Sequence, residues 1–425
     1  MTVVGASSDL AGRIAEFVRR DFTPHFGERA EPFPGHPLWS RLRDLGSELW
    51  LDTGSLDDAA EVWTREFSAL TTNNTLLNKE VQRGVYDALI HEAADLLAAE
   101  ADLSDRDRLL ELAFILNARH ALRLVERFDA YVSVEEHTDL AHDVDAAVET
   151  ARRYHAICPE RFIIKVPLTP AGLLATRRLA DEGVPVNHTL GFSARQNVVI
   201  ARIARPRFVN VFLGRLGSFV KTNGLGGGEY VGQRSTLASQ RVVRALREEG
   251  KTPSRQIAAS FRAGPQVQDL AGVDVLTMPP KVAREFLDLG LGPDDLDNRT
   301  TGRPEPPLAE AVDPTDIGLP VLWEVDERLL ACLDALEQED LRAFTPGDLV
   351  RFFADHGCGD VLVDWTDEQV ATSAAEGKIP TLANWRDALT AGEVGLDALM
   401  NLAGLGAFAA DQKAMDTHVA EVLKA

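Results

Sequence analysis

The stretch that decides the fold is RFIIKVPL at residues 161–168, in which one lysine interrupts an otherwise apolar run. The apolar residues around Lys165 occupy both faces of an alternating chain, which predicts a strand buried on both sides, as in a parallel barrel. Burying an unpaired ammonium group is costly, and burial favours the neutral amine. A neutral amine is a nucleophile toward carbonyl groups. On its own, the stretch leaves two interpretations open: a buried structural cation or a catalytic amine.

Composition narrows the classes of protein that this chain can represent. It has 425 residues, of which 45% are hydrophobic, enough for a large α/β domain and an additional piece. A formal net charge of -22 argues against nucleic-acid partners, and an anionic substrate would need local arginines. The three cysteines form no CxxC pair, which suits a reducing cytoplasm. No signal peptide or membrane span is evident. We expect a cytoplasmic protein without membrane partners, and the sequence is compatible with a homo-oligomer.

Short apolar runs like 161–168 recur along the chain and alternate with helical segments. Helical spacing is clear at 170–183, for example, where a glycine ends the pattern. Alternation of strand and helix repeated eight times predicts a (β/α)8 TIM barrel. The eight expected strands are 47–54, 67–74, 129–136, 161–168, 184–192, 208–216, 255–262 and 274–280.

The barrel is expected to have additional segments at both ends. Residues 1–46 predict a helical lead-in, and 47–300 the barrel itself. The proline-rich, acidic stretch 301–320 is typical of a linker. Residues 321–425 predict a C-terminal helical extension without a catalytic motif. His356 and Cys358 are too few to bind a metal there.

Polar side chains gather where the predicted strands end, and the carboxyl ends of barrel strands are where function resides. Each has an ordinary alternative: aspartate and asparagine cap helices, Glu135 can pair with Lys165 and do nothing more, and arginines occupy rims. Their occurrence on seven consecutive strands predicts an active site. The residues concerned are Asp52, Asn73, Glu135, Lys165, Asn187, Thr189, Asn210, Arg215, Ser260 and Arg262.

These residue types suit Schiff-base chemistry on a phosphorylated sugar. An amine that condenses with a ketose needs a proton shuttle to expel water and a base for carbon–carbon cleavage, and the carboxylates Asp52 and Glu135 are suitable. Thr189 is a candidate to hold the catalytic water. Arg215 and Arg262 are candidates to bind a phosphate through charge-assisted bonds.

Seven segments, in order, resemble the transaldolase family. The pair KVP and NHTLGFS, within residues 162–193, is the most specific element. The matching segments are WLDTGSLDD (50–58), LTTNNTL (70–76), VSVEE (132–136), FIIKVP (162–167), EGVPVNHTLGFS (182–193), VFLGRL (211–216) and ASFR (259–262).

The resemblance implies transfer of a dihydroxyacetone unit from a ketose phosphate, sedoheptulose 7-phosphate or fructose 6-phosphate, to an aldose phosphate in the pentose phosphate pathway. It implies no metal and no organic cofactor. Lys165 resembles the Schiff-base lysine, Asp52 the general acid–base, and Glu135 with Thr189 the pair that manages the catalytic water. The resemblance assigns substrate hydroxyls to Asn73 and Asn187, a pocket wall to Phe212, and the phosphate site to Asn210, Arg215, Ser260 and Arg262.

Three departures from the family pattern leave alternatives open. Asn74 stands where the family has proline, Asn210 stands where it has serine, and the loop 220–230 is rich in glycine. The last two favour transfer to an unusual acceptor in specialised sugar metabolism. A fructose-6-phosphate aldolase, which releases dihydroxyacetone, is disfavoured because such relatives carry glutamine where this chain has Glu135. A non-catalytic sugar-phosphate sensor is disfavoured by the complete catalytic set, although the helical extension suits a role in contacts.

Overall fold

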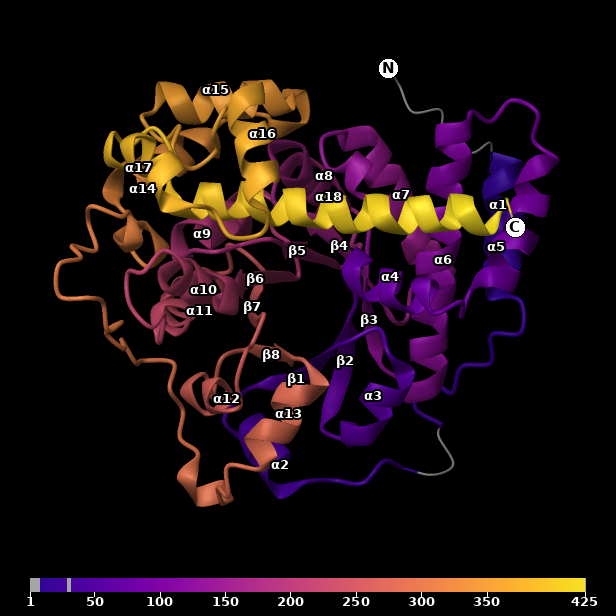
Figure 1. The fold of residues 1–425 in the computed structure, drawn as a ribbon, viewed down its shortest axis with the longest axis horizontal. Helices are drawn as coiled ribbons and strands as arrows, with labels where there is room; N and C mark the ends of the chain where they lie inside the picture. Colours follow the sequence, from indigo (N-terminus) through magenta and orange to yellow (C-terminus); the bar gives the residue numbers. More distant parts are fainter. Residues whose placement is uncertain (1–7, 29–31, 425) are drawn as a thin grey trace.

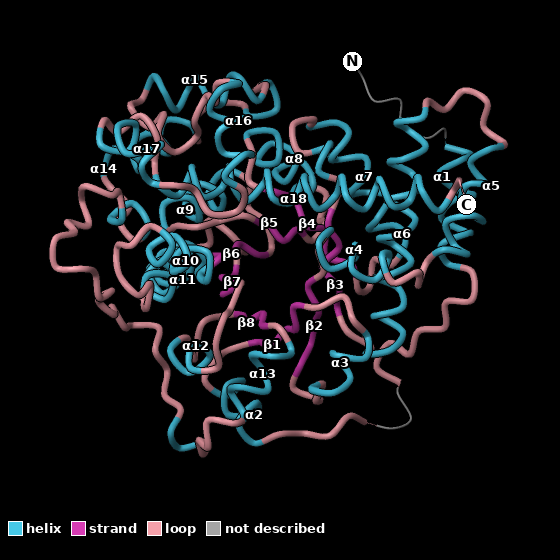
Figure 2. Tube along the Cα trace, viewed as in Figure 1, coloured by secondary structure: helices cyan, strands magenta, loops and turns pink. Residues whose placement is uncertain are grey.

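Eight parallel strands close into a barrel in the computed structural model, which describes residues 8–28 and 32–424 (Figures 1 and 2). Each strand pairs with the next one along the chain, and the eighth closes onto the first. The predicted (β/α)8 fold is therefore confirmed, and each strand falls within its predicted range. The strands are β1 Glu48–Asp52, β2 Phe67–Thr71, β3 Tyr131–Glu135, β4 Phe162–Pro167, β5 Val186–Thr189, β6 Phe208–Phe212, β7 Arg255–Ala259 and β8 Val275–Met278.

Helices surround this barrel, as the ring of cyan around the magenta strands in Figure 2 shows. Two helices, α1 Ser8–Arg19 and α2 Pro37–Asp44, precede the first strand. The helices that follow successive strands are α3 Leu56–Val62, α4 Asn74–Gln82, α5 Asp87–Ala98, α6 Asp105–Phe128, α7 Val144–Ile157, α8 Pro170–Asp181, α9 Ala194–Ile203, α10 Leu213–Thr222, α11 Val231–Glu248, α12 Pro265–Asp269 and α13 Pro280–Leu287.

Successive side chains of a strand point to opposite faces of the sheet. This alternation explains how the barrel is filled and how it presents polar groups. The rings of Trp50 and Phe208 meet edge to face, with centroids 4.8 Å apart, and both side chains are buried. Two residues further along the same strands, on the same face, stand Asp52 and Asn210. These two strands thus carry apolar packing below and a polar side chain nearer the carboxyl end.

The prediction for 208–216 was wrong in its second half. The strand β6 ends at Phe212 and α10 begins at Leu213, so Arg215 lies in the first turn of a helix. Gly214 explains the abrupt start of this helix. A Cβ atom on Gly214 would overlap the carbonyl oxygen of Ser260 and lie 2.7 Å from Cγ of Arg262. Because glycine has no such atom, α10 begins directly against the loop that follows β7.

The C-terminal region is helical and packs on the barrel. The longest of its helices, α18, runs across the carboxyl-end face as the yellow rod of Figure 1 and contacts α4, α16 and the short helices η1 (Thr138–Leu140) and η3 (Leu319–Leu322). Its buried apolar residues belong to the same core cluster as those of the barrel. Within 301–320, Leu308 pairs with Gly226 of the glycine-rich loop through a backbone bridge. The helices of this region are α14 Glu327–Leu336, α15 Pro346–Asp355, α16 Asp367–Glu376, α17 Leu382–Thr390 and α18 Leu396–Val422.

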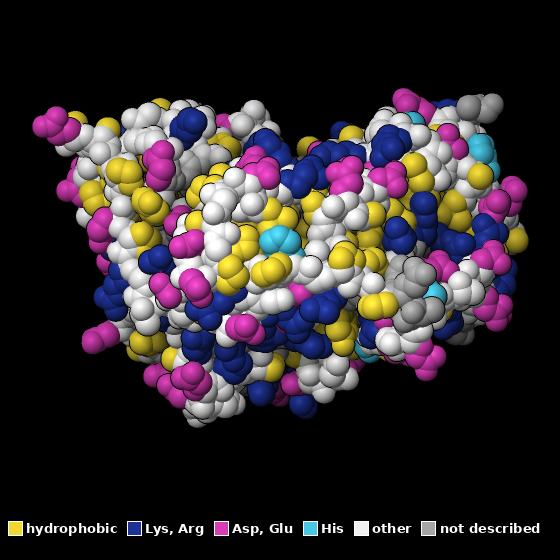
Figure 3. Space-filling model, turned by 90° about the horizontal axis from the view of Figure 1, so that it is seen from below, with side chains coloured by type: hydrophobic (Ala, Val, Ile, Leu, Met, Phe, Trp, Pro, Cys, Tyr) yellow, Lys and Arg dark blue, Asp and Glu magenta, His cyan; other side chains and the backbone are white. Residues whose placement is uncertain are grey.

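The outer surface carries charges of both signs. Figure 3 shows lysine and arginine interspersed with aspartate and glutamate on one side of the molecule. Across the described ranges, no helix combines the length and the apolar character that crossing a membrane requires.

Candidate active site

Lys165 points into the barrel near the carboxyl end of β4. Its side chain is 5% exposed, and Nζ donates a hydrogen bond to the carbonyl oxygen of Thr72 at 3.1 Å. Nζ also lies 3.4 Å from Oε1 of Glu135. Glu135 and Lys165 are register partners across β3 and β4, so their side chains leave the sheet side by side. The amine is therefore buried, with one carboxylate within ion-pair distance.

Glu135 is held on its other side by the backbone. Its Oε2 accepts a hydrogen bond of 2.9 Å from the N–H of Asn74. Burial raises the pKa of the Glu135 carboxyl, and the charge on Lys165 and the bond from Asn74 partly oppose this rise. A proline at position 74, as the resemblance leads us to expect, would carry no N–H. Asn74 thus supplies Glu135 with a donor.

Asp52 ends β1 and is half-buried, with direct access to the cavity. Its Oδ1 accepts a hydrogen bond of 2.9 Å from the hydroxyl of Thr71, which lies 2.9 Å from the hydroxyl of Thr277. Burial raises the pKa of Asp52, and the positive charge at Lys165 partly offsets this effect. Thr277 was not predicted from the sequence. It is a polar residue near the carboxyl end of the eighth strand, so the criterion applied to the other seven strands would have identified it.

A chain of amides crosses β3, β5 and β6. Asn210 donates to Oδ1 of Asn187 at 3.2 Å, and Asn187 donates to the hydroxyl of Ser133 at 3.1 Å. Asn210 therefore orients another predicted site residue. Thr189 is fully buried in β5, and among the described residues its hydroxyl has no hydrogen-bond partner.

The opposite end of the site is cationic. Arg215 is 8% exposed, and its Nη1 has no hydrogen-bond partner within the described part of the chain. Burial, and then the like charge of Arg262, lower the pKa of Arg215 to about 10. Arg262 is exposed at the mouth. A buried guanidinium without a hydrogen-bonded carboxylate attracts an anion, and phosphate satisfies its geometry.

Two of the predicted residues also have conformational roles. Ser260 has φ 67°, in the left-handed region that non-glycine residues rarely adopt, and such strain is typical of functional sites. Asn73 caps α4, since its Oδ1 accepts a hydrogen bond of 2.8 Å from the N–H of Leu76. Both side chains nevertheless line the cavity, so the capping interpretation of Asn73 and a binding role are compatible.

These groups enclose a cavity of about 160 Å³ at the carboxyl ends of the strands. Of the residues predicted from the sequence, Glu135 and Thr189 do not line it, and no residue of the loop 220–230 does. Phe408, from α18, lines it and was not predicted. The predicted residues that line it are Asp52, Asn73, Lys165, Asn187, Asn210, Phe212, Arg215, Ser260 and Arg262.

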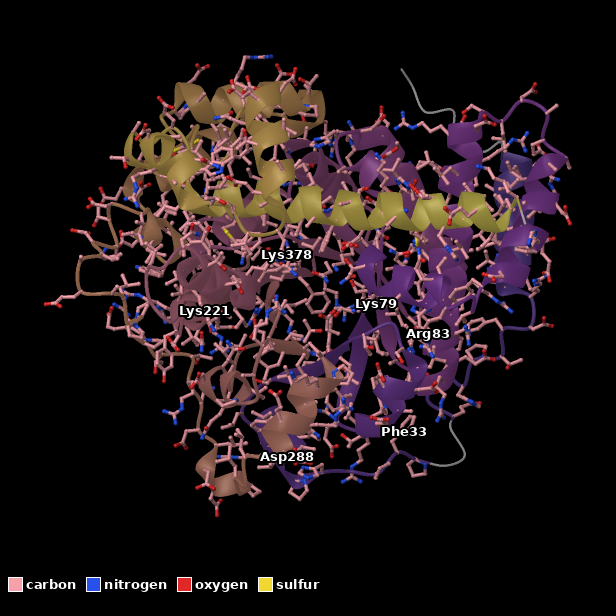
Figure 4. The ribbon with its side chains drawn as sticks, in the orientation of Figure 1. Phe33, Lys79, Arg83, Lys221, Asp288 and Lys378 are labelled. Atoms are coloured by element: carbon pink, nitrogen blue, oxygen red, sulfur yellow. The ribbon has the colours of Figure 1, made fainter. Side chains whose placement is uncertain are left out.

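Lys79 adds positive charge near Asp52. Figure 4 labels Lys79 of α4 and Lys378, which follows α16, near the middle of this view. Both side chains are exposed, and the charge of Lys79 acts on Asp52. Within residues 8–28 and 32–424, no cluster of three or more histidine, cysteine, aspartate or glutamate residues could hold a metal ion.

Fold and site together define a (β/α)8-barrel protein with a buried lysine beside a glutamate, an aspartate in the same cavity and a pair of arginines. The model of the transaldolase/fructose-6-phosphate aldolase family matches residues 49–345, so the chain belongs to this family. The match covers the barrel and α14, whereas α15 to α18 lie beyond it.

Curated relatives agree with this assignment. A probable transaldolase of Thermus thermophilus is 33% identical over 253 residues, covering 57% of this chain and 94% of the relative. A transaldolase of Xanthomonas campestris is 29% identical over 253 residues, with 58% and 77% covered. A probable transaldolase of Dictyostelium discoideum is 30% identical over 223 residues, with 51% and 69% covered.

Proposed function

We propose that this protein is a transaldolase that transfers a dihydroxyacetone unit from a ketose phosphate, fructose 6-phosphate or sedoheptulose 7-phosphate, to an aldose phosphate. The observation that carries the proposal is the amine of Lys165, buried in the cavity 3.4 Å from the Glu135 carboxyl. Membership of the family and the names of the relatives support it. Such an enzyme belongs to the pentose phosphate pathway, in the cytoplasm.

In the proposed reaction, Lys165 attacks the ketose carbonyl and Glu135 handles the protons as water leaves. Asp52 then takes the proton of the hydroxyl next to the breaking carbon–carbon bond, and its half-buried position in the cavity suits this task. The aldose departs, and the three-carbon unit stays on Lys165 as an enamine. The enamine attacks the aldehyde of the acceptor, and the steps reverse. Asn73 and Asn187 orient sugar hydroxyls, Phe212 forms a wall, and the phosphate lies against Arg215, Arg262, Ser260 and Asn210.

Covalent trapping tests this proposal directly. Borohydride added with fructose 6-phosphate should reduce the Schiff base and leave the dihydroxyacetone unit on Lys165, as peptide mass spectrometry would detect. Lys165→Ala should lose the adduct while keeping a native circular dichroism spectrum. An adduct on another residue, or none with either ketose phosphate, would contradict the assignment of Lys165.

A second assay separates transfer from release, because the matching family includes fructose-6-phosphate aldolases. With erythrose 4-phosphate present, a transaldolase forms sedoheptulose 7-phosphate. Free dihydroxyacetone as the main product would favour the aldolase alternative. Turnover only with other aldehydes would favour a specialised acceptor.

A further inference from the structure

The helix α18 gives the catalytic cavity one of its walls. Phe408 is 4% exposed and lines the cavity, although it is separated from the barrel strands by more than a hundred residues of sequence. Its ring centroid lies 5.6 Å from Nζ of Lys165 and 5.3 Å from Cζ of Arg215. The ring also meets that of Phe212 edge to face, with centroids 6.3 Å apart. One aromatic ring therefore adjoins both the amine and the buried guanidinium.

Polar contacts fix α18 in this position. Asn401 donates a hydrogen bond of 3.0 Å to the carbonyl oxygen of Leu190, just after β5. Asp411 accepts a hydrogen bond from the hydroxyl of Thr75 in α4. These contacts lie on the helix before and after Phe408, so the ring is held from both sides.

The helix backbone itself rests on the cavity wall at Gly404. A Cβ atom there would lie 2.9 Å from Cδ2 of Leu190 and 3.2 Å from Nη1 of Arg215. At Gly406, two residues further along the helix, no heavy atom would lie within 4 Å of such a Cβ. The chain therefore offers a matched pair of helical glycines, one against the site and one in open space.

We propose that Phe408 is a specificity-determining residue that limits the length of the acceptor aldehyde, an inference that rests on the proposed function. The three-carbon unit remains on Lys165, and the acceptor must present its aldehyde there while its phosphate lies toward Arg215 and Arg262. Its carbon chain then runs beside the Phe408 ring, which adjoins both ends of this path. The cavity of about 160 Å³ is small, since ligand pockets are commonly about 300–1,000 Å³.

The test compares acceptors of increasing length with sedoheptulose 7-phosphate as donor, because fructose 6-phosphate would only be regenerated from glyceraldehyde 3-phosphate. We expect Phe408→Ala to raise the ratio of kcat/KM for ribose 5-phosphate over that for glyceraldehyde 3-phosphate by about tenfold, the scale on which small changes of pocket volume discriminate substrates. Phe408→Leu should raise it less. A ratio that stays constant while both values change together would overturn the proposal, because it would mean that the ring only supports packing.

The matched glycines provide a second route that does not depend on the folding of Phe408→Ala. Gly404→Ala adds a methyl group against Leu190 and Arg215 and should lower the same ratio, whereas Gly406→Ala should leave it unchanged. Equal ratios for the two glycine variants would count against the proposal.

Borohydride trapping of the wild-type protein distinguishes the two levels of inference. If wild type is trapped and the acceptor ratio does not respond to Phe408→Ala, the inference about Phe408 fails and the proposed function stands. If wild type gives no adduct, the proposed function fails, and the role of Phe408 fails with it.

Discussion

Asp52 and Glu135 carry the same chemical group, but their surroundings in this site differ. Burial raises the pKa of both Asp52 and Glu135. Glu135 pairs with Lys165 and accepts the N–H of Asn74, and it does not line the cavity. Asp52 lines the cavity and has the Thr71 hydroxyl as its donor. Glu135 is thus suited to exchange protons with the amine, and Asp52 with a hydroxyl of the substrate.

The bond from Asn74 gives a prediction for the pH dependence. Asn74 is the first residue of α4, and Asn73 before it is extended, so the backbone there suits proline, whose ring takes the place of the N–H that now faces Glu135. Asn74→Pro removes the N–H that stabilises charged Glu135, and the pKa of Glu135 should rise further. If the carboxylate form is required, kcat/KM falls as pH drops through this pKa, so the fall should begin at higher pH. On the acid side we expect a loss of roughly ten- to a hundredfold, because a hydrogen bond to a charged group contributes about 1.5–3 kcal/mol.

Asn74→Ala is the control, since it keeps the backbone donor and removes only the side-chain bond to the carbonyl oxygen of Glu136. Profiles of kcat/KM against pH for the wild type and both variants decide the matter. Identical acid limbs for Asn74→Pro and Asn74→Ala would show that the N–H does not tune Glu135.

At the scale of elements, the strands were predictable because their burial on both faces leaves a mark in sequence. After Arg161, the stretch FIIKVPL (162–168) has Lys165 as its one polar residue, and apolar residues flank it on both sides. The positions of Asp52, Lys165 and Asn187 in the cavity then follow from the alternation of side chains. The start of α10 was not predictable in this way, because Gly214 acts through a close approach to a loop that is distant in sequence.

The sequence pattern also did not predict where α18 packs. Apolar residues occur all around this helix, so no single stripe indicates which side packs on the barrel. Phe408 faces the catalytic cavity, whereas Leu402 and Leu405 line a separate cavity of about 930 Å³ between the C-terminal helices and the barrel. Only the folded structure assigns these faces.

The close approach at Gly214 can be tested as a property of two elements. Gly214→Ala would force α10 away from the loop after β7, and such overpacking costs about 1–3 kcal/mol. The displaced loop carries Ser260 and Arg262, so KM for phosphorylated substrates should rise more than kcat falls. Urea unfolding and steady-state kinetics measure the two effects. Gly406→Ala, the same change at a helical glycine with open space, should leave KM and kcat unchanged and raise stability by about 0.5–1 kcal/mol, because alanine favours a helix more than glycine does.

On the scale of the whole molecule, two arginines of α9 join the barrel to the C-terminal helices. Arg195 bonds to Asp397 at the start of α18, at 2.7 and 2.8 Å, and to Asp360 at 2.6 Å. Seven residues on, Arg202 bonds to Asp334 and Glu337, both at 2.7 Å. The difference lies in the partners: the side chain of Asp397 is fully buried, whereas those of Asp334 and Glu337 are 73% and 44% exposed.

This difference predicts unequal effects of the same substitution. Arg195→Ala leaves the carboxylate of Asp397 buried without its cation, which costs about 3–5 kcal/mol of unfolding free energy. Arg202→Ala releases carboxylates that water can solvate, so its loss should be about 1 kcal/mol or less. Denaturant unfolding of both variants measures the two values.

Because Asp397 lies at the start of the helix that carries Phe408, Arg195→Ala should also loosen the wall of the cavity and change the acceptor ratio, while Arg202→Ala should not. Equal losses of stability would mean that the buried joint at Asp397 does not fix α18 to the barrel.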